Sequence, residues 1–259
     1  MPTTILTGST GFVGSSILHQ LLTSSPPHHV ILPVRKASAS QSLFSTHPEY
    51  DKSLLTFATV PDITVEGAFD SIFRDHAGID YVIHCAAPLV GDASATDFVE
   101  HFEKPNVLGN LRLLSAAKTL GQNVKTVVVT GTINAVTMGS QDDVKARAFT
   151  SESWLPEGHD DAIKTNQQFV HYCVGKKVGE EAIWKFVKEE KPKFGVVVFL
   201  PGLIFGPMQQ SVKGIDRINF SMQQVHSILN SGKSDGGKVP GTMFPAYVSR
   251  SQSLLSRAC

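Results

Sequence analysis

Short apolar runs and segments with helical spacing alternate along most of this chain. Apolar runs of strand length cover residues 3–7, 30–34, 54–60, 79–85 and 124–130. Between several of them, apolar residues recur every three to four positions in residues 12–22, 65–73 and 107–117, which is typical of amphipathic helices. Gly121 is a predicted helix C-cap, whereas residues 37–53 indicate a loop or a poor helix. The alternation predicts an α/β fold with a doubly wound parallel sheet and helices on both faces.

Three glycines separate the first predicted strand from the first predicted helix. Gly8, Gly11 and Gly14 form the pattern G-x-x-G-x-x-G. Such glycines allow a tight turn, room for a pyrophosphate against the backbone, and close packing of helix on strand. The amides at the start of the helix would then face the phosphates. A purely structural glycine turn is the alternative, but the flanking strand and helix favour a dinucleotide site in a Rossmann fold.

The residues after the second predicted strand indicate which dinucleotide is bound. This strand ends at Arg35 and Lys36, and no acidic residue occurs between Gly14 and Glu49. A NAD-binding unit carries an acidic residue near this point for the ribose hydroxyls, whereas arginine accommodates a 2′-phosphate. We therefore expect NADP (NADPH) as cofactor; the alternative is a solvated basic pair at a strand end.

A second group of candidate residues lies in a predicted amphipathic helix over residues 166–190. Tyr172 and Lys176 are four residues apart, so both side chains project from one face of this helix. A nearby cation favours the phenolate and lowers the tyrosine pKa, which makes the hydroxyl a better acid towards a carbonyl oxygen. Taken alone, such a pair is usually an ordinary surface pair. Its place after the fifth strand of a nucleotide-binding fold favours a catalytic role.

Composition limits the possible partners. The 259 residues include 23 basic and 23 acidic side chains, so the formal net charge of zero favours neither nucleic acid nor an anionic membrane as partner. The sequence contains neither an apolar run of membrane-spanning length nor a visible export signal. Its three cysteines, Cys85, Cys173 and Cys259, lack metal-ligand spacing. We expect reduced thiols in a cytoplasmic protein without a bound metal.

These features together resemble the extended short-chain dehydrogenase/reductase family. The matching motifs are Gly8, Gly11 and Gly14; Asp80-Tyr-Val-Ile-His84-Cys-Ala86-Ala87; Asn106-Val-Leu-Gly-Asn110; and Tyr172-Cys-Val-Gly-Lys176. Finer matches are Val34-Arg35, Phe69-Asp70, Ala87-Pro88 and Pro201-Gly-Leu-Ile-Phe-Gly206-Pro207. They look most like the branch that contains dihydroflavonol reductases, cinnamoyl-CoA reductases and fungal aldehyde or methylglyoxal reductases. The resemblance covers residues 3 to about 213.

The resemblance implies a catalytic set of Thr132, Tyr172, Lys176 and Asn106. Tyr172 would protonate the substrate oxygen while Lys176 holds the nicotinamide ribose. Thr132 would orient the carbonyl, although the family's usual Thr-Ser-Ser segment is Thr130-Gly131-Thr132 here. Threonine can donate the same hydrogen bond, but its methyl group restricts the rotamer. Asn106 would support a relay water beneath Lys176, or it is only a helix-entry residue after Pro105. His84 is expected to be a satisfied core histidine.

The resemblance also implies a set of residues that contact the cofactor. Arg35 and Lys36 would meet the 2′-phosphate, Asp62 and Ile63 the adenine, and Pro201, Gly202 and Leu203 the nicotinamide. The full expected set is Thr7, Gly8, Thr10, Gly11, Phe12, Val13, Gly14, Arg35, Lys36, Asp62, Ile63, Ala86, Ala87, Pro88, Thr130, Tyr172, Lys176, Pro201, Gly202 and Leu203.

The C-terminal residues depart from the family pattern. Pro245-Ala-Tyr-Val248 is similar to the start of a further strand, but a polar, serine-rich tail follows it. We expect a truncated or mis-spliced product, or a naturally shortened protein, with an incomplete C-terminal substrate lobe. The expected division is an NADP-binding Rossmann domain over residues 1–200 and a partial substrate-binding lobe over residues 201–259.

Three functions follow from these expectations. The first is an NADPH-dependent carbonyl reductase that acts on a small aldehyde or ketone, with Tyr172 as the acid. The second is an NAD-dependent nucleotide-sugar epimerase or dehydratase, which the basic end of the second strand disfavours. The third is a dinucleotide-binding protein whose catalysis is impaired by the unusual tail. The sequence indicates neither a nucleic-acid nor a membrane partner, and it carries no signal for an oligomeric state.

Overall fold

The structure is a computed structural model that describes residues 1–89, 94–139, 148–212, 214, 218–234 and 248–250. Its centre is a seven-stranded sheet in the order β3-β2-β1-β4-β5-β6-β7. The strands are β1 (Thr3–Thr7), β2 (His29–Val34), β3 (Leu55–Thr59), β4 (Tyr81–His84), β5 (Thr126–Thr130), β6 (Gly195–Leu200) and β7 (Val248–Arg250). Strands β1 to β6 pair in parallel, and β7 pairs antiparallel with β6. The strand order reverses direction between β1 and β4, as in a Rossmann fold.

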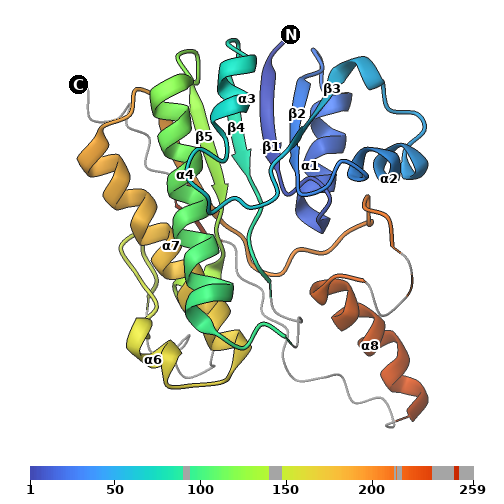
Figure 1. Ribbon diagram of the computed structural model, residues 1–259. Helices are drawn as coiled ribbons and strands as arrows, with labels where there is room; N and C mark the ends of the chain where they lie inside the picture. The colour runs from blue at the N-terminus through green and yellow to red at the C-terminus, as the bar shows by residue number, and fades with distance from the viewer. Residues whose placement is uncertain (90–93, 140–147, 213, 215–217, 235–247, 251–259) are drawn as a thin grey trace.

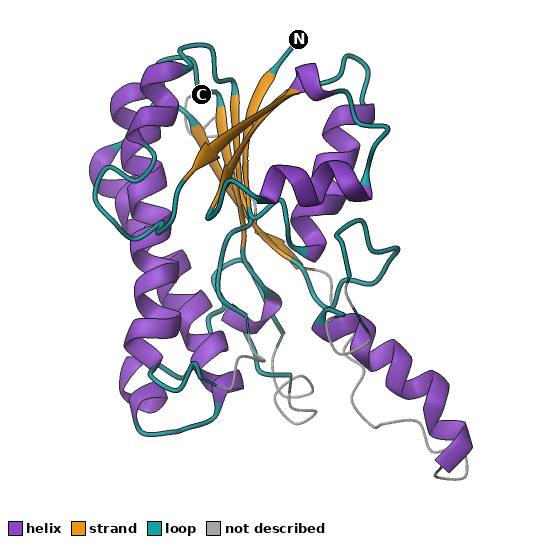
Figure 2. Ribbon diagram, turned by 45° about the vertical axis from the view of Figure 1, so that its right-hand side comes forward, coloured by secondary structure: helices purple, strands orange, loops and turns teal. Residues whose placement is uncertain are grey.

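Helices cover both faces of this sheet, as Figures 1 and 2 show. One face carries α1 (Phe12–Thr23) and α2 (Ala39–Thr46), and the other carries α3 (Asp70–Asp75), α4 (Lys104–Leu120) and α7 (Gln168–Glu190). The short helix α6 (His159–Ile163) packs near the start of α7, and α8 (Phe220–Ser234) lies away from the sheet. Short turns complete the fold: 3-10 turns at Lys52–Leu54 and Ile133–Ala135, and a π-helical turn at Val99–Glu103. The predicted doubly wound α/β fold is confirmed.

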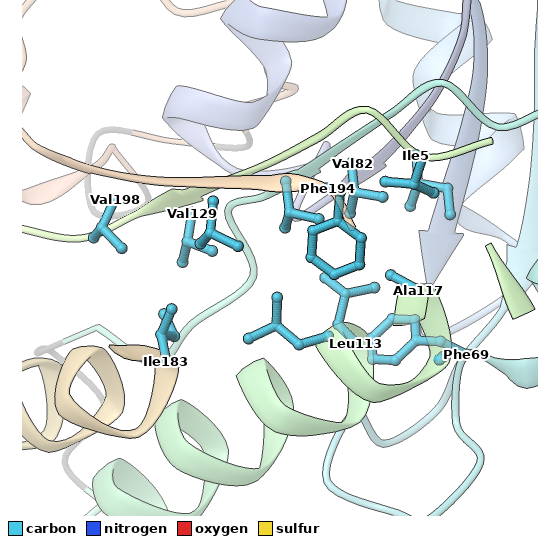
Figure 3. Close-up of a cluster of buried hydrophobic side chains, with 14 of the residues drawn as sticks. Ile5, Phe69, Val82, Leu113, Ala117, Val129, Ile183, Phe194 and Val198 are labelled. Atoms are coloured by element: carbon cyan, nitrogen blue, oxygen red, sulfur yellow. The ribbon is translucent and has the colours of Figure 1, made fainter. Parts of the chain in front are cut away.

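Two apolar layers hold the sheet between the helices. Along β1, Ile5 faces α3, α4 and α7, whereas Leu6 faces α1 and α2, because successive strand residues point to opposite faces. Figure 3 shows the first layer, in which Phe69, Leu113 and Phe194 pack against strand residues such as Val82. The strands are buried on both faces, which explains their nearly continuous apolar runs.

Several predicted boundaries were wrong. The helix expected over residues 65–73 is α3, Asp70–Asp75, because Gly67 takes a left-handed φ of 72° and Val65 is exposed. The fourth and fifth strands begin two residues later than predicted, at Tyr81 and Thr126. Residues 39–46 form a helix without a buried side chain, and β6 is a strand that the sequence analysis did not assign.

The C-terminal predictions are only partly covered. Residues 245–247 of the expected additional strand and the tail 251–259 lie outside the described residues, and Val248 begins β7. No helix in the described part of the chain is long and apolar enough to cross a membrane. The division at residue 200 remains a prediction.

Candidate functional site

The loop after β1 requires glycine at two positions. Gly8 has a left-handed φ of 70°, and a Cβ there would lie 2.8 Å from the Ala86 amide nitrogen. A Cβ on Gly14 would lie 2.1 Å from the Gly8 carbonyl oxygen. Gly11 is the N-cap of α1 and no side chain caps this helix, so its first amides are available to an anion. The glycine cradle and the uncapped helix end therefore fit the pyrophosphate of a dinucleotide.

Thr7 fastens this loop to the end of β4. Its Oγ1 accepts hydrogen bonds from the amides of Cys85 and Ala86, each at 3.1 Å. With both acceptor positions used, the hydroxyl must donate to His84 Nδ1, which lies 2.7 Å away. Burial lowers the His84 pKa to about 3, so the ring is neutral. The prediction that His84 is a satisfied core histidine is confirmed.

The residues expected around the adenosine follow β2 and β3. Arg35 and Lys36 come directly after β2 and are exposed, so both can reach a phosphate from solvent. Asp62 Oδ1 accepts from the amide and the hydroxyl of Thr64, each at 2.8 Å, and these bonds lower the Asp62 pKa. Ile63 packs against α4 at Gly109, where a Cβ would lie 2.7 Å from Ile63 Cδ1. The carboxyl ends of β2 and β3 are thus followed by the basic pair Arg35 and Lys36 and by the ordered turn at Asp62, at the same edge of the sheet.

Glycines also set the position of α7. A Cβ on Gly175 would lie 3.0 Å from Phe102 Cβ, and one on Gly179 would lie 2.8 Å from Asn106 Cβ. The spacing of four places both glycines on one helix face, so α7 approaches the π-helical turn and α4 closely. Asn110 Nδ2 donates to the Gly179 carbonyl at 3.1 Å and fixes the contact. This packing fixes the helix that carries the candidate catalytic pair.

Tyr172 and Thr132 meet beside the end of β5. Burial raises the Tyr172 pKa, and the interaction of the phenol with the Thr132 side chain opposes this shift. The Thr132 hydroxyl itself donates to Asn134 Oδ1 at 3.3 Å. Thr132 is buried, and its Oγ1 also accepts from the Asn134 amide at 3.2 Å, which fixes its rotamer. The two hydroxyls that the family resemblance places in one catalytic set therefore lie near each other.

Lys176 points to a different group. Its Nζ donates to the Thr130 carbonyl at 3.1 Å, and burial lowers its pKa to about 8. The expectation that this cation lowers the Tyr172 pKa was wrong for this state: the phenol's shift is upward, from burial, and Lys176 is not among its causes. The spacing of four places both side chains on one helix face, but the Lys176 ammonium donates to the Thr130 carbonyl, whereas the Tyr172 phenol interacts with Thr132.

A cavity of about 10 Å³ lies beneath Lys176, close to the smallest size that holds one water. Asn106 and Asn110 of α4 line it together with His84, Thr130 and Glu180. Asn106 Nδ2 donates to the Phe102 carbonyl at 2.8 Å, and helical backbone already begins at Val99. Asn106 lies in the first turn of α4, directly after Pro105, and also lines the cavity, so both of its expected roles remain predictions. Ala86 and Ala87 also line this cavity, which connects them to the Lys176 region.

The segment after β6 approaches the site from the other side. The Ile133 amide donates to the Pro201 carbonyl at 3.0 Å, which ties residues 201–203 to the Thr132 segment. Beyond them, Ile204 to Pro207 and α1 enclose an open groove of about 580 Å³. Phe12 and Val13 line this groove. Within the described residues, no cluster of histidine, cysteine and acidic side chains could hold a metal ion.

Comparison with known sequences identifies the family. The profile of the NAD dependent epimerase/dehydratase family matches residues 4–229. This chain belongs to the NAD dependent epimerase/dehydratase family.

The curated relatives of this chain include proteins named as reductases. The NADPH-dependent methylglyoxal reductase of Saccharomyces cerevisiae is 28% identical over 250 residues, covering 94% of this chain and 69% of that protein. A ketoreductase of Aspergillus niger is 28% identical over 235 residues, covering 90% of this chain and 66% of that protein. The first curated relatives are each covered over 66% of their length, so this chain spans just under two thirds of them.

Solved structures of the family share the fold. The yeast methylglyoxal/isovaleraldehyde reductase Gre2 complexed with NADPH is 27% identical, with a TM-score of 0.78 over 93% of this chain and 68% of that chain. Gre2 from Candida albicans in complex with NADPH is 26% identical, with a TM-score of 0.74 over 88% of this chain and 66% of that chain.

Two polar residues of the site were not predicted from the sequence of this family member. Glu180 and Asn110 line the cavity beneath Lys176, but neither was singled out for a role. Glu180 could have been found, because a further step of four along the helix from Lys176 reaches it. Asn110 belongs to a motif that carried the family resemblance, yet its contact with Gly179 depends on how α4 and α7 pack.

Proposed function

We propose that this chain is an NADPH-dependent carbonyl reductase that transfers hydride to a small aldehyde or ketone. The observation that carries this proposal is that the segment after β5 contacts both candidate groups: Lys176 donates to the Thr130 carbonyl, and the Tyr172 phenol interacts with Thr132. Ala86, against which Gly8 of the glycine loop packs, lines the same cavity as Lys176. In open α/β sheets, ligands bind at this end of the strands, where the strand order reverses. The reductase names of several curated relatives support the same reaction class.

The residues of the chain divide the reaction between them. Tyr172 donates its hydroxyl proton to the carbonyl oxygen, and Thr132 donates a second hydrogen bond that orients the substrate. The bound NADPH supplies the hydride. Arg35 and Lys36 hold its 2′-phosphate, the loop from Gly8 to Gly14 holds its pyrophosphate, and Lys176 holds its nicotinamide ribose.

The remaining parts of the proposal concern the whole protein. Residues 1–200 form the NADP-binding domain and residues 201–259 contribute part of the substrate lobe. Asp62 and Ile63 flank the adenine, and Pro201 to Leu203 flank the nicotinamide. The expected location is cytoplasmic, on the cysteine pattern of the sequence.

The experiment is NADPH oxidation by the purified protein against a panel of aldehydes, ketones and diketones. Tyr172→Phe should lower kcat by about 100-fold or more, because general acid catalysis contributes that much. Tyr81→Phe is the matched control, since it removes a phenol hydroxyl at the amino end of β4, away from the site. Equal rates for Tyr172→Phe and the wild-type protein would refute the mechanism.

Two other outcomes would replace the proposal. Calorimetric NADPH binding without turnover of any carbonyl, under conditions where a longer relative works, would indicate a dinucleotide-binding protein without catalysis. Tight retention of NAD by the purified protein would favour an epimerase or dehydratase instead.

A further inference from the structure

The cavity beneath Lys176 contains a second ionisable side chain of α7. Glu180 follows Lys176 by four residues and is only 2% exposed. Its Oε1 accepts a hydrogen bond from the indole Nε1 of Trp184 at 3.1 Å. Both Glu180 and Lys176 line the cavity, from the same face of the helix. A carboxylate is rarely buried in a protein interior unless a cation or hydrogen bonds compensate for its lost hydration.

Near neutral pH, the other groups around Lys176 are uncharged. From β4, His84 is a neutral ring, and burial raises the pKa of the Cys85 thiol, so Cys85 is uncharged near neutral pH. From α4, the cavity lining consists of the amides Asn106 and Asn110. From β5, the Thr130 carbonyl accepts a hydrogen bond from the Lys176 ammonium but is itself neutral. On α7 itself, the Tyr172 phenol is uncharged because burial raises its pKa.

We propose that Glu180 is a positioning residue for Lys176: its carboxylate, fixed by Trp184, keeps the buried ammonium charged and in place at the Thr130 carbonyl. The catalytic meaning of this role rests on the proposed reductase function, in which Lys176 holds the nicotinamide ribose. The electrostatic role itself belongs to the free protein. Burial lowers the Lys176 pKa to about 8, and attraction first to Cys85 and then to Glu180 opposes this fall. The attraction to Cys85 requires its thiolate, which burial disfavours near neutral pH, whereas Glu180 can act there as a carboxylate.

The direct test measures the protonation of Lys176 in the protein without cofactor. Lysine side chains are labelled with ¹³C at Cε, and NMR follows their titration with pH; Lys176→Met identifies the signal. Glu180→Gln keeps the size of the side chain and an oxygen that accepts from Trp184, but it removes the charge. The Lys176 midpoint should fall by about one pH unit or more, the usual effect of losing a nearby opposite charge.

Glu181→Gln is the matched control. Glu181 is the next residue of α7 and lies 3.9 Å from Lys177, with 47% of its side chain exposed. Its replacement removes the same charge from the same helix outside the cavity, so the Lys176 midpoint should not move. An unchanged midpoint in Glu180→Gln, or an equal shift in Glu181→Gln, overturns the proposal. Should Glu180→Gln fail to fold, Glu180→Asp withdraws the charge by one methylene, and an unchanged midpoint there overturns it equally.

Kinetics separate this proposal from the proposed function. In an active enzyme, Glu180→Gln should move the alkaline limb of the kcat/KM profile to lower pH, with less loss of rate near pH 6 than near pH 8. A merely structural role for Glu180 would lower the rate at every pH and leave the limb in place. If no carbonyl is reduced by the wild-type protein, the reductase proposal fails, while the NMR midpoints still decide the role of Glu180.

Discussion

Replacement of Gly131 by alanine should destabilise the protein at the point where the site meets the core. Gly131 lies between β5 and Thr132, where the resembling family usually has serine. A Cβ on Gly131 would lie 2.5 Å from Leu200 Cδ2, 2.9 Å from Val198 Cγ1 and 3.3 Å from the Phe199 carbonyl oxygen. Leu200 and Val198 are fully buried in the same apolar layer, in which Figure 3 labels Val198, so neither side chain can swing aside into solvent.

The size of the effect follows from two opposing contributions. Overpacking of a close-packed core costs about 1–3 kcal/mol. Alanine also restricts the unfolded chain more than glycine does, which favours the folded state by about 0.4–1 kcal/mol. Gly131 does not have a left-handed φ, so no backbone strain is added. The steric cost therefore exceeds the entropic gain, and the free energy of unfolding should fall by about 1–2 kcal/mol.

Urea denaturation of the wild-type and variant proteins measures this difference. Gly78→Ala is the matched control, because Gly78 is exposed and an added Cβ there meets no atom within 4 Å. The double variant Gly131→Ala, Leu200→Ala tests the cause, since removing the Leu200 branch makes room for the new methyl group. Its loss of stability should be smaller than the sum of the single losses by about 1–2 kcal/mol. A Gly131→Ala protein as stable as the wild type, or strict additivity in the double variant, would refute the steric explanation.

Two further predictions concern charge. Arg35→Glu should weaken NADPH binding, measured by calorimetry, by about 10-fold to 100-fold, because a charge-assisted bond to the 2′-phosphate is lost. The same change should weaken NADH binding less. Lys193→Glu before β6 is the control, and equal losses for both cofactors would contradict the assignment of Arg35 to the 2′-phosphate. Lys176→Met should become less stable relative to the wild type as pH rises. The pKa of Lys176 in the folded protein, about 8, is below the ordinary lysine value of 10.5, so the wild-type protein gains about 2–3 kcal/mol between pH 7 and pH 10. Urea denaturation at both pH values checks this, and a constant difference between the two proteins would contradict a buried ammonium.

The sequence predicted the parts of the fold that depend on local pattern. Buried parallel strands give continuous apolar runs, so five strands were located from their composition. Helix α7 was placed within two residues of its observed start, because its apolar spacing extends over many turns. The helix before β4 was predicted to begin too early. Gly67 has a left-handed backbone conformation, so the apolar residues before it are not part of the helix. The run Gly195–Leu200 has the same apolar signal as the other strands but was left unassigned.

The residues of the site likewise fall into those that a local sequence pattern predicts and those that depend on tertiary packing. Gly14 is required by its contact with Gly8 inside one loop, and Gly8 by its left-handed φ as well as by its contact with Ala86 after β4, so the spacing of the two glycines in the sequence already indicates the loop. Glu180 depends on the cavity that α4, α7 and β4 enclose together, and no local pattern specifies that packing. The upward shift of the Tyr172 pKa could not be predicted from a helical spacing of four, because burial outweighs the effects that spacing describes.

The segment from Thr130 to Thr132 determines the geometry that the spacing of Tyr172 and Lys176 only permits. The Thr130 carbonyl accepts a hydrogen bond from Lys176, and the Thr132 side chain interacts with the Tyr172 phenol. Gly131 lies between them and packs against Leu200 without a side chain of its own. A methyl group at Gly131 would push the segment away from β6 and move both hydrogen-bond partners at once. Gly131→Ala should therefore reduce kcat more than its loss of stability explains, and its effect should not add to that of Tyr172→Phe, because both changes act on the same proton-donating hydroxyl.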